Sequence, residues 1–196
     1  MTTPGKFASD TGFFAVLEFW FGKEPGPARA EWFRKDLAFD AAIRRRFGEL
    51  HAASARRELQ AWRAAPESML ALVVILDQFS RNLYRDDARA FAQDADAREC
   101  ARQALGRGDD LALLPVQRQF LYMPFEHSED LAEQERAVEL MRSLEAFEPT
   151  RGLTTWAIRH RDIVARFGRF PHRNAALGRA STAEEIEFLK QPGSGF

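Results

Sequence analysis

Apolar residues recur along most of the chain at the three- and four-residue spacing of amphipathic α-helices. Between Leu153 and Phe170, for example, Trp156, Ile163 and Phe167 return to one side of the expected helix. No run alternates apolar and polar residues with the two-residue period typical of a β-strand. The pattern therefore predicts an all-α protein of about seven to nine helices. The expected helices cover residues 11–22, 28–59, 67–79, 87–105, 116–127, 129–147, 153–170 and 182–191.

Residues that begin or end helices support these boundaries. Asp10, Asp86 and Ser128 each precede an expected helix and are interpreted as N-caps, and Ser181 with Glu184 has the pattern of a capping box. The other signals are prolines in first turns and glycines after last turns, namely Pro66, Pro115, Gly22, Gly106 and Gly108. Short loops favour antiparallel helix pairs, stacked either as an α-solenoid or as a bundle. We expect a single all-α domain over residues 1–196, with residues 191–196 as a loose C-terminal tail.

The composition predicts a large hydrophobic core and argues against several kinds of binding partner. The chain has 196 residues, of which 45% are hydrophobic and 17 are Phe, which is enough for a sizeable packed core. Because its net charge is −1 at pH 7, we expect neither nucleic acid nor a membrane surface as a partner. The one cysteine, Cys100, excludes an internal disulfide. There is no signal-peptide pattern, and the longest apolar run, Met69–Leu76, is too short to cross a bilayer, so we expect a cytoplasmic protein.

Three polar residues fall on helix faces that are otherwise apolar. Asp77 follows an apolar stripe at helical spacing, and Arg81, four residues later, could neutralise its charge. His127 and His160 take inward positions on two later helices. If these positions converge, they form a polar pocket together with Gln78. Each also has a structural interpretation, because inward histidines and Asp–Arg pairs more often stabilise a core than act on a ligand.

The densest basic stretch is "RFGRFPHRN", residues 166–174. Part of its charge could balance the acidic helix expected at 129–147, and Asp162 has the spacing to pair with Arg166 or with Arg159. Gly168 and Pro171 end the helix, so the residues that follow lie at a turn. Several donors at a turn beside phenylalanines suit a planar anion such as a carboxylate or phosphate. These donors are Arg169, His172, Arg173 and Asn174.

The chain contains, in order, "FWFG", "LDQFSRNLYR", "AFAQDADAR", "QRQFLYMPFEHSEDLAEQE" and "HRDIVARFGRFPHRNAALGRASTAEEIEFL". Together these stretches resemble the bacterial domain-of-unknown-function family numbered 924. The resemblance implies a fold of the tetratricopeptide-like superfamily with stacked antiparallel helix pairs, and it implies no established activity, substrate or cofactor. Members usually have proline at the position of Ser80, which implies a looser local turn here. The motif positions of the family correspond to Asp77, Gln78, Arg81, Asn82, His127, Ser128, Glu129, His160, Arg166, Arg169, His172, Arg173 and Asn174, without assigned roles.

The residues leave four interpretations open. The first is a soluble binding module whose pocket holds an anionic small molecule or a peptide carboxylate, with Arg81, Arg169 and Arg173 as anion contacts. Its expected ligand-binding residues are the motif positions above other than Ser128. The second is a hydrolase-like enzyme in which His127 or His160 is a general acid or base oriented by Asp77 or Glu129.

The third interpretation is a metal centre that combines the histidines 127, 160 and 172 with Glu126 or Asp162. It is disfavoured because the chain has neither an HExxH motif nor paired cysteines, so we expect no metal and no cofactor. The fourth is a buried polar network that only fixes how the helices stack. A homodimer is compatible with all four.

Overall fold

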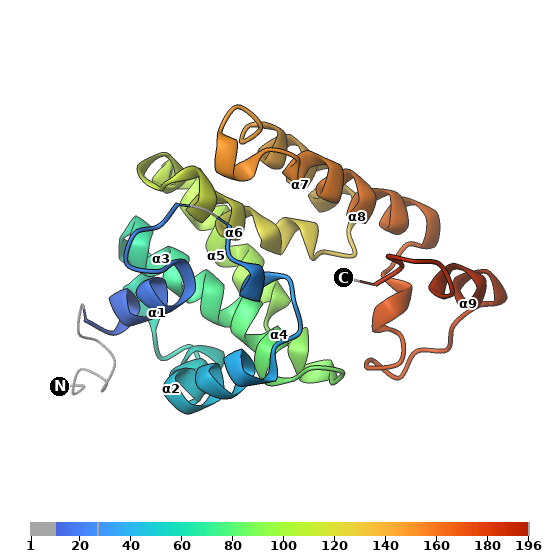
Figure 1. Ribbon diagram of the computed structural model, residues 1–196, viewed down its shortest axis with the longest axis horizontal. Helices are drawn as coiled ribbons and strands as arrows, with labels where there is room; N and C mark the ends of the chain where they lie inside the picture. Colours follow the sequence, from blue (N-terminus) through green and yellow to red (C-terminus); the bar gives the residue numbers. More distant parts are fainter. Residues whose placement is uncertain (1–10, 27, 196) are drawn as a thin grey trace.

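The structure, a computed structural model, describes residues 11–26 and 28–195. This part of the chain is all-helical, as the sequence predicts, and it contains no β-strand (Figure 1). Six π-helical residues, Val74–Phe79, join α3 and α4 into one helix, so the described residues contain eight separate helices, within the expected range. The bounds are α1 Thr11–Phe21, α2 Leu37–Ala55, α3 Pro66–Val73, α4 Ser80–Leu83, α5 Asp94–Arg107, α6 Pro115–Glu126, α7 Leu131–Arg142, α8 Leu153–Phe167 and α9 Ala183–Leu189.

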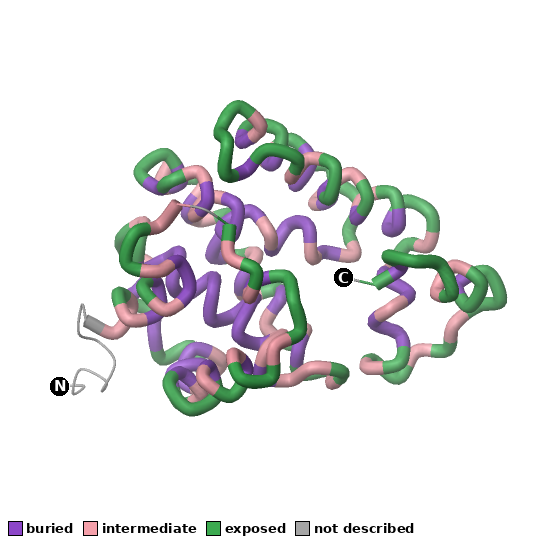
Figure 2. The backbone as a smooth tube through the Cα atoms, viewed as in Figure 1, coloured by how far each residue is buried: buried purple, intermediate pink, exposed green. Residues whose placement is uncertain are grey.

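The joined helix from Pro66 to Leu83 lies at the centre of the larger, N-terminal part of the molecule. Its sequence is apolar around the whole circumference between Met69 and Leu76, which is typical of a helix covered on every side. Each of these eight side chains is at most 3% exposed. Helices α1, α2, α5 and α6 pack around it, and Figure 2 shows the buried positions gathered there. Among the described helices, none combines the length and the apolar character needed to cross a membrane.

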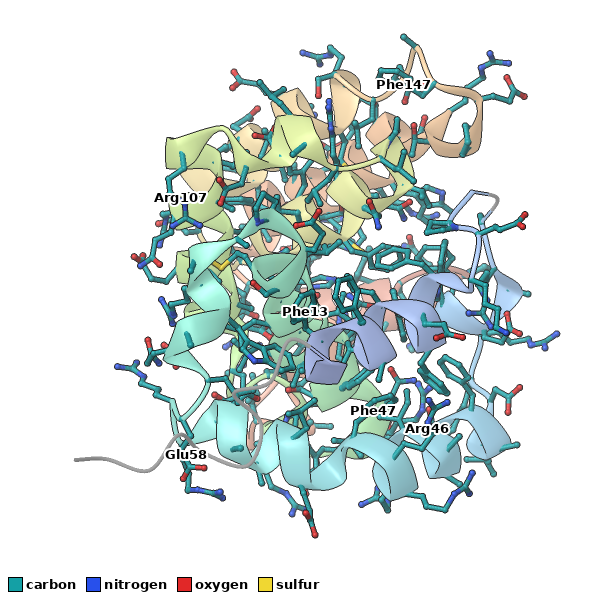
Figure 3. The ribbon with its side chains drawn as sticks, turned by 90° about the vertical axis from the view of Figure 1, so that its left-hand side faces the viewer. Phe13, Arg46, Phe47, Glu58, Arg107 and Phe147 are labelled. Carbon is teal, nitrogen blue, oxygen red and sulfur yellow. The ribbon has the colours of Figure 1, made fainter. Side chains whose placement is uncertain are left out.

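Aromatic side chains fill the core beside the central helix. Trp20 on α1 makes edge contacts with Phe79 and with Phe120 on α6, at ring-centroid distances of 5.7 and 5.4 Å. Contacts of this kind contribute about 0.5–1.5 kcal/mol beyond the area that they bury. In Figure 3, Phe47 points from α2 into the molecule, and the Arg46 guanidinium lies 5.0 Å from the Phe47 ring centroid. The high Phe content of the sequence is therefore used mainly for packing.

The C-terminal part is built on the helix pair α7 and α8. These helices lie antiparallel along one another, as expected for consecutive helices with a short connection (Figure 1). Gly168, with φ of 68°, ends α8 in the left-handed conformation that glycine adopts easily. The chain then turns through Pro171–Arg173 and reaches α9, where Phe188 packs on Phe167 of α8 at 5.0 Å. The tetratricopeptide-like relationship stays a prediction.

Three of the expected N-caps differ from those in the structure, and Asp10 lies outside the described residues. Asp86 adopts a left-handed conformation, with φ of 61°, in a turn that precedes the short 3-10 helix Ala88–Ala90. The capping carboxylate of that helix belongs to Asp87, and α5 begins only at Asp94. In each case the cap is the residue whose oxygen accepts from the first free backbone N–H groups. Asp130 caps α7 in place of Ser128, and the capping box of α9 is Thr182 with Glu185, one residue after the predicted pair.

The predictions for two of the helices were also partly wrong. Trp156 is 52% exposed because α8 is covered by α7 and α6 on one side only, and Arg159 lies over the indole instead. The helix expected over residues 28–59 is interrupted, since α2 begins at the Asp36 cap and leaves Phe33 and Leu37 exposed. The expected loose tail has two anchoring contacts: Arg159 of α8 donates to the Gly193 carbonyl at 3.2 Å, and the buried Ser194 hydroxyl donates to the Leu189 carbonyl at 3.1 Å.

Candidate functional site

Asp77 lies at the centre of a buried hydrogen-bonded cluster. Its side chain is 0% exposed and belongs to the π-helical segment, in which the wider turn changes the direction of side chains relative to the flanking α-helix. Nδ1 of His127, the residue that ends α6, donates to Asp77 Oδ1 at 2.7 Å. Gln78 Nε2 donates to Asp77 Oδ2 at 2.6 Å, and Arg81 Nη1 lies 3.1 Å from Oδ1. The predicted inward position of Asp77 and its pairing with Arg81 agree with this geometry.

Arg81 extends the cluster to a residue that the sequence analysis did not single out. Its Nη1 and Nη2 atoms donate to Asp94 Oδ1 and Oδ2, at 2.9 and 3.1 Å. Arg173 Nη1 donates to the same Asp94 Oδ2 at 3.2 Å. Five side chains therefore form one continuous chain, His127–Asp77–Arg81–Asp94–Arg173, which we call the Asp77–Arg173 network. It joins α6, the central helix, the first turn of α5 and the turn after α8.

Ser80 stabilises the central helix beside this network. Its hydroxyl donates to the Leu76 carbonyl at 2.6 Å and lies 2.8 Å from Nε2 of His51. Ser80 is 0% exposed and the helix continues through it, so the looser turn implied by the family resemblance is wrong for this chain. No pattern in the sequence indicated the π-helical segment.

The charges of the network shift the pKa values of its members in physically consistent directions. Burial alone would raise the pKa of Asp77, but the charge of Arg81 and the His127 hydrogen bond outweigh it, so the pKa lies well below its usual range. Burial, and then the charge of Arg81, lowers the pKa of His127. The pKa of Arg173 falls to about 10, mainly because of burial and then because of Arg81. At neutral pH Asp77 is thus ionised, the Arg81 and Arg173 guanidinium groups are protonated, and the His127 imidazole is neutral.

Arg173 has hydrogen-bonding capacity that the chain does not use. It is 6% exposed, and the two ring contacts of its guanidinium carbon are with Phe91 at 4.5 Å and Phe170 at 4.6 Å. Among the described residues its buried Nε atom has no hydrogen-bond partner, and Asp94 is paired with Nη1 alone. A buried donor without an acceptor costs about 1–3 kcal/mol. The edge formed by Nε and Nη2 is therefore the least satisfied polar feature of the cluster.

The second inward histidine lies beside the network. His160 Nδ1 is 2.9 Å from Glu126 Oε1 and 2.9 Å from the Trp156 carbonyl oxygen. The His160 ring is 6.5 Å from the His127 ring and 5.8 Å from that of Phe170. His172 lies on the same phenylalanine at 5.5 Å, and burial, followed by the charge of Arg173, lowers its pKa to about 3. His160 thus lies close to His127 and therefore beside Asp77, as the hypothesis of convergence required, and His172 contacts the same Phe170 ring as His160.

Other predicted site residues lie elsewhere. Arg169 donates twice to Glu185 of α9, at 2.7 and 2.8 Å, and Asn174 donates to the same carboxylate at 3.3 Å. Glu129 pairs with Arg179 at 2.7 Å. Arg169, expected as an anion contact, is thus already occupied by a carboxylate of the chain, as is the Arg179 beside it. This second network joins α9 and the turn after α8 to the segment between α6 and α7.

Three further motif positions have partners outside both networks. Asn82 donates to Asp40 of α2 at 2.7 Å. Arg166 pairs with Glu184 at 2.7 Å instead of with Asp162, because α9 packs beside the end of α8. Ser128 is buried, and its hydroxyl oxygen accepts from the Asp130 backbone N–H at 3.2 Å. These positions stabilise helix packing and α7 and do not contact the Asp77–Arg173 network through any described hydrogen bond.

Two cavities in the described part of the chain are lined by residues outside the Asp77–Arg173 network. One is an open groove of about 420 Å³ between α8 and residues 191–194, and the other, of about 10 Å³, lies beside Ser54. Arg166 lines the groove and belongs to the predicted site residues, but its side chain is 51% exposed and already pairs with Glu184. The candidate site is therefore the unsatisfied buried donor of Arg173 and not the groove. No group of three or more possible metal ligands occurs within residues 11–26 and 28–195.

The fold and the cluster define an all-helical protein with a buried, charge-balanced polar network. Comparison with protein families matches residues 16–193 to the family described as "bacterial protein of unknown function (DUF924)". The chain belongs to this family, which confirms the resemblance noted in the sequence. A protein of unknown function from Agrobacterium tumefaciens has a similar structure, with a TM-score of 0.82 and 45% sequence identity over 91% of this chain and 96% of that chain. A search of the curated proteins returned no match.

Proposed function

We propose that the protein binds a small carboxylate, held by the Nε–Nη2 edge of Arg173. The observation that carries this proposal is the buried Nε atom, which lacks an acceptor among the described residues. A carboxylate would supply that acceptor and a second one for Nη2, in the bidentate geometry that a guanidinium favours. Such a ligand would also counter the cost of burying Arg173, whose pKa is lowered to about 10 mainly by burial.

The surroundings of Arg173 favour a small, planar monoanion. Phe91 and Phe170 contact the guanidinium through their rings, and Asp94 occupies Nη1, so a ligand has only the remaining edge. Access is narrow, because the side chains of Arg173, His127 and Arg81 are 7%, 11% and 21% exposed. A doubly charged phosphate would place more negative charge beside Asp94 than a carboxylate does, which costs more in a buried setting.

Isothermal titration with acetate tests the proposal. For so few atoms we expect a weak Kd, on the order of 1 mM. Arg173→Lys keeps a positive charge facing Asp94 and removes the two-donor edge, so it should weaken binding by at least about tenfold. Arg166→Lys, in the same stretch but paired on the surface, is the matched control and should leave binding unchanged. Undiminished binding by Arg173→Lys would contradict the proposal.

A second titration separates two sources of the carboxylate. A short peptide with a free C-terminus and the same peptide with an amidated C-terminus are compared with acetate. Binding of acetate alone identifies a small-molecule site, as the narrow access favours. Binding of the free-terminus peptide, but not of the amidated one, identifies a peptide-end site.

The pair His127–Asp77 favours one other candidate, a hydrolase-like activity. An imidazole oriented by a carboxylate at 2.7 Å is the arrangement of a general base, and His127 Nε2 has no hydrogen-bond partner among the described residues. In this candidate Nε2 takes a proton from water as the water oxygen bonds to the acyl carbon of an ester. The acyl C–O bond then breaks, and the departing alkoxide takes that proton back from Nε2 and leaves as an alcohol. His127→Asn should then abolish hydrolysis of small carboxylate esters, and equal rates in the variant and the wild type would remove the candidate.

A further inference from the structure

The protonation state of His127 determines what kind of group it can recognise. Its Nδ1 atom donates to Asp77 Oδ1 at 2.7 Å, and that carboxylate stays ionised because Arg81 lies 3.1 Å away. Burial, and then the charge of Arg81, lowers the pKa of His127, so its ring is neutral at pH 7 and carries one N–H. That N–H is used by Asp77. The other nitrogen, Nε2, therefore presents a lone pair and acts as a hydrogen-bond acceptor.

The cluster thus presents groups of opposite hydrogen-bonding polarity. The free edge of Arg173 offers only donors, whereas His127 Nε2 offers only an acceptor. Among the described residues, the buried Nε atom of Arg173 has no hydrogen-bond partner, and Arg173 donates only through Nη1, to Asp94. The hydrogen bond of His127 is formed by Nδ1, with Asp77. Two ring side chains lie between the two ends. The His160 ring is 6.5 Å from the His127 ring and 5.8 Å from the Phe170 ring, and the Phe170 ring is 4.6 Å from the Arg173 guanidinium carbon. A ligand that satisfies both ends must therefore carry an anion and a donor.

We infer that the ligand is a small hydroxycarboxylate, whose carboxylate accepts from Arg173 and whose hydroxyl donates to His127 Nε2. A hydroxyl fits better than an ammonium group, because two guanidinium groups already lie in the cluster and a third positive charge would be repelled. This inference rests on the proposed function, since it assigns the second contact of the same carboxylate ligand. It adds a specificity-determining role for His127 that does not require any reaction.

Matched pairs of acids test the inference. Glycolate and acetate differ only by a hydroxyl group, as do lactate and propionate. Each hydroxy acid should bind the wild-type protein about threefold to tenfold more tightly than its partner, the difference that one added hydrogen bond gives. His127→Asn keeps an amide N–H near the position of Nδ1 for Asp77 and lacks the Nε2 acceptor, so it should bind both members of a pair equally.

The outcomes separate this inference from the proposed function. Equal binding of glycolate and acetate by the wild type, with both lost in Arg173→Lys, overturns the hydroxycarboxylate and leaves the carboxylate site. A preference for glycolate that persists in His127→Asn overturns the role of His127. If the wild type binds none of the four acids, the proposed function fails and this inference fails with it. Circular dichroism of each variant establishes that it is folded before its titration is interpreted.

Discussion

Asp94→Asn should be among the most destabilising single substitutions of a charged residue in this protein. Asp94 accepts two hydrogen bonds from Arg81, at 2.9 and 3.1 Å, and one from Arg173, at 3.2 Å. Asparagine keeps the shape but removes the charge, which leaves two nearby guanidinium groups with Asp77 as the remaining carboxylate of the network. Removing one partner of a buried ion pair costs about 3–5 kcal/mol. That loss is a large part of the roughly 5–15 kcal/mol that stabilises a domain.

The same helix offers a matched control. Asp96, also in the first turn of α5, pairs with Arg57 at 2.7 Å, but the Arg57 side chain is 68% exposed. An exposed pair contributes about 0–1 kcal/mol, so Asp96→Asn should have little effect. Both substitutions remove one acidic charge from the same helix N-terminus, and the helix-dipole contribution therefore cancels in the comparison.

Urea unfolding followed by circular dichroism measures both free energies of unfolding. We expect Asp94→Asn to lose at least about 2 kcal/mol more than Asp96→Asn, with an unchanged dependence on urea concentration. If the two variants differ by less than about 0.5 kcal/mol, the Asp77–Arg173 network is not the buried charge network described above.

Two further predictions concern acid sensitivity and a pair of glycines. The pKa of His172 is about 3 when folded, below 6.5 for an unfolded histidine, so the unfolded chain binds more protons and stability is lost as pH falls. Between pH 6.5 and 5 the free energy of unfolding should fall by at most about 2 kcal/mol because of His172. In His172→Gln this part of the pH dependence should be absent. Gly106 lies inside α5 with open space around it, whereas Gly108 ends the helix at φ of 73°. Gly106→Ala should raise stability by about 0.5–1 kcal/mol and Gly108→Ala should lower it, and thermal unfolding that shows the same sign for both would contradict this reasoning.

The sequence predicted those site features that depend on the geometry of a single helix. Asp77 continues an apolar stripe and Arg81 follows one turn later, so burial and pairing could both be anticipated from helical spacing. The inward positions of His127 and His160 were anticipated in the same way. The π-helical segment could not be, because it arises from a local change of hydrogen-bonding pattern that leaves the apolar spacing nearly unaltered.

Partners that come from distant parts of the chain were not predictable. Asp94 and Arg173 are 79 residues apart, and only the packing of α5 against the turn after α8 brings them together. Conversely, Arg169 had the same sequence features as Arg173, yet Glu185 of α9 takes up its donors. Since an arginine paired with a carboxylate of the chain and an arginine with an unpaired buried donor have the same sequence signature, only the three-dimensional arrangement distinguishes Arg173.

The central claim is that the Nε–Nη2 edge of Arg173 binds a carboxylate by donating to it, and the most direct measurement observes that edge itself. In protein labelled with nitrogen-15, the Nε–H signal of Arg173 is assigned by its absence from the spectrum of Arg173→Lys, and acetate is then titrated into the wild type. We predict that this signal moves in a saturable way, while the Nε–H signal of Arg166 on the surface stays in place. An Arg173 signal that does not respond to acetate or to glycolate would contradict the account.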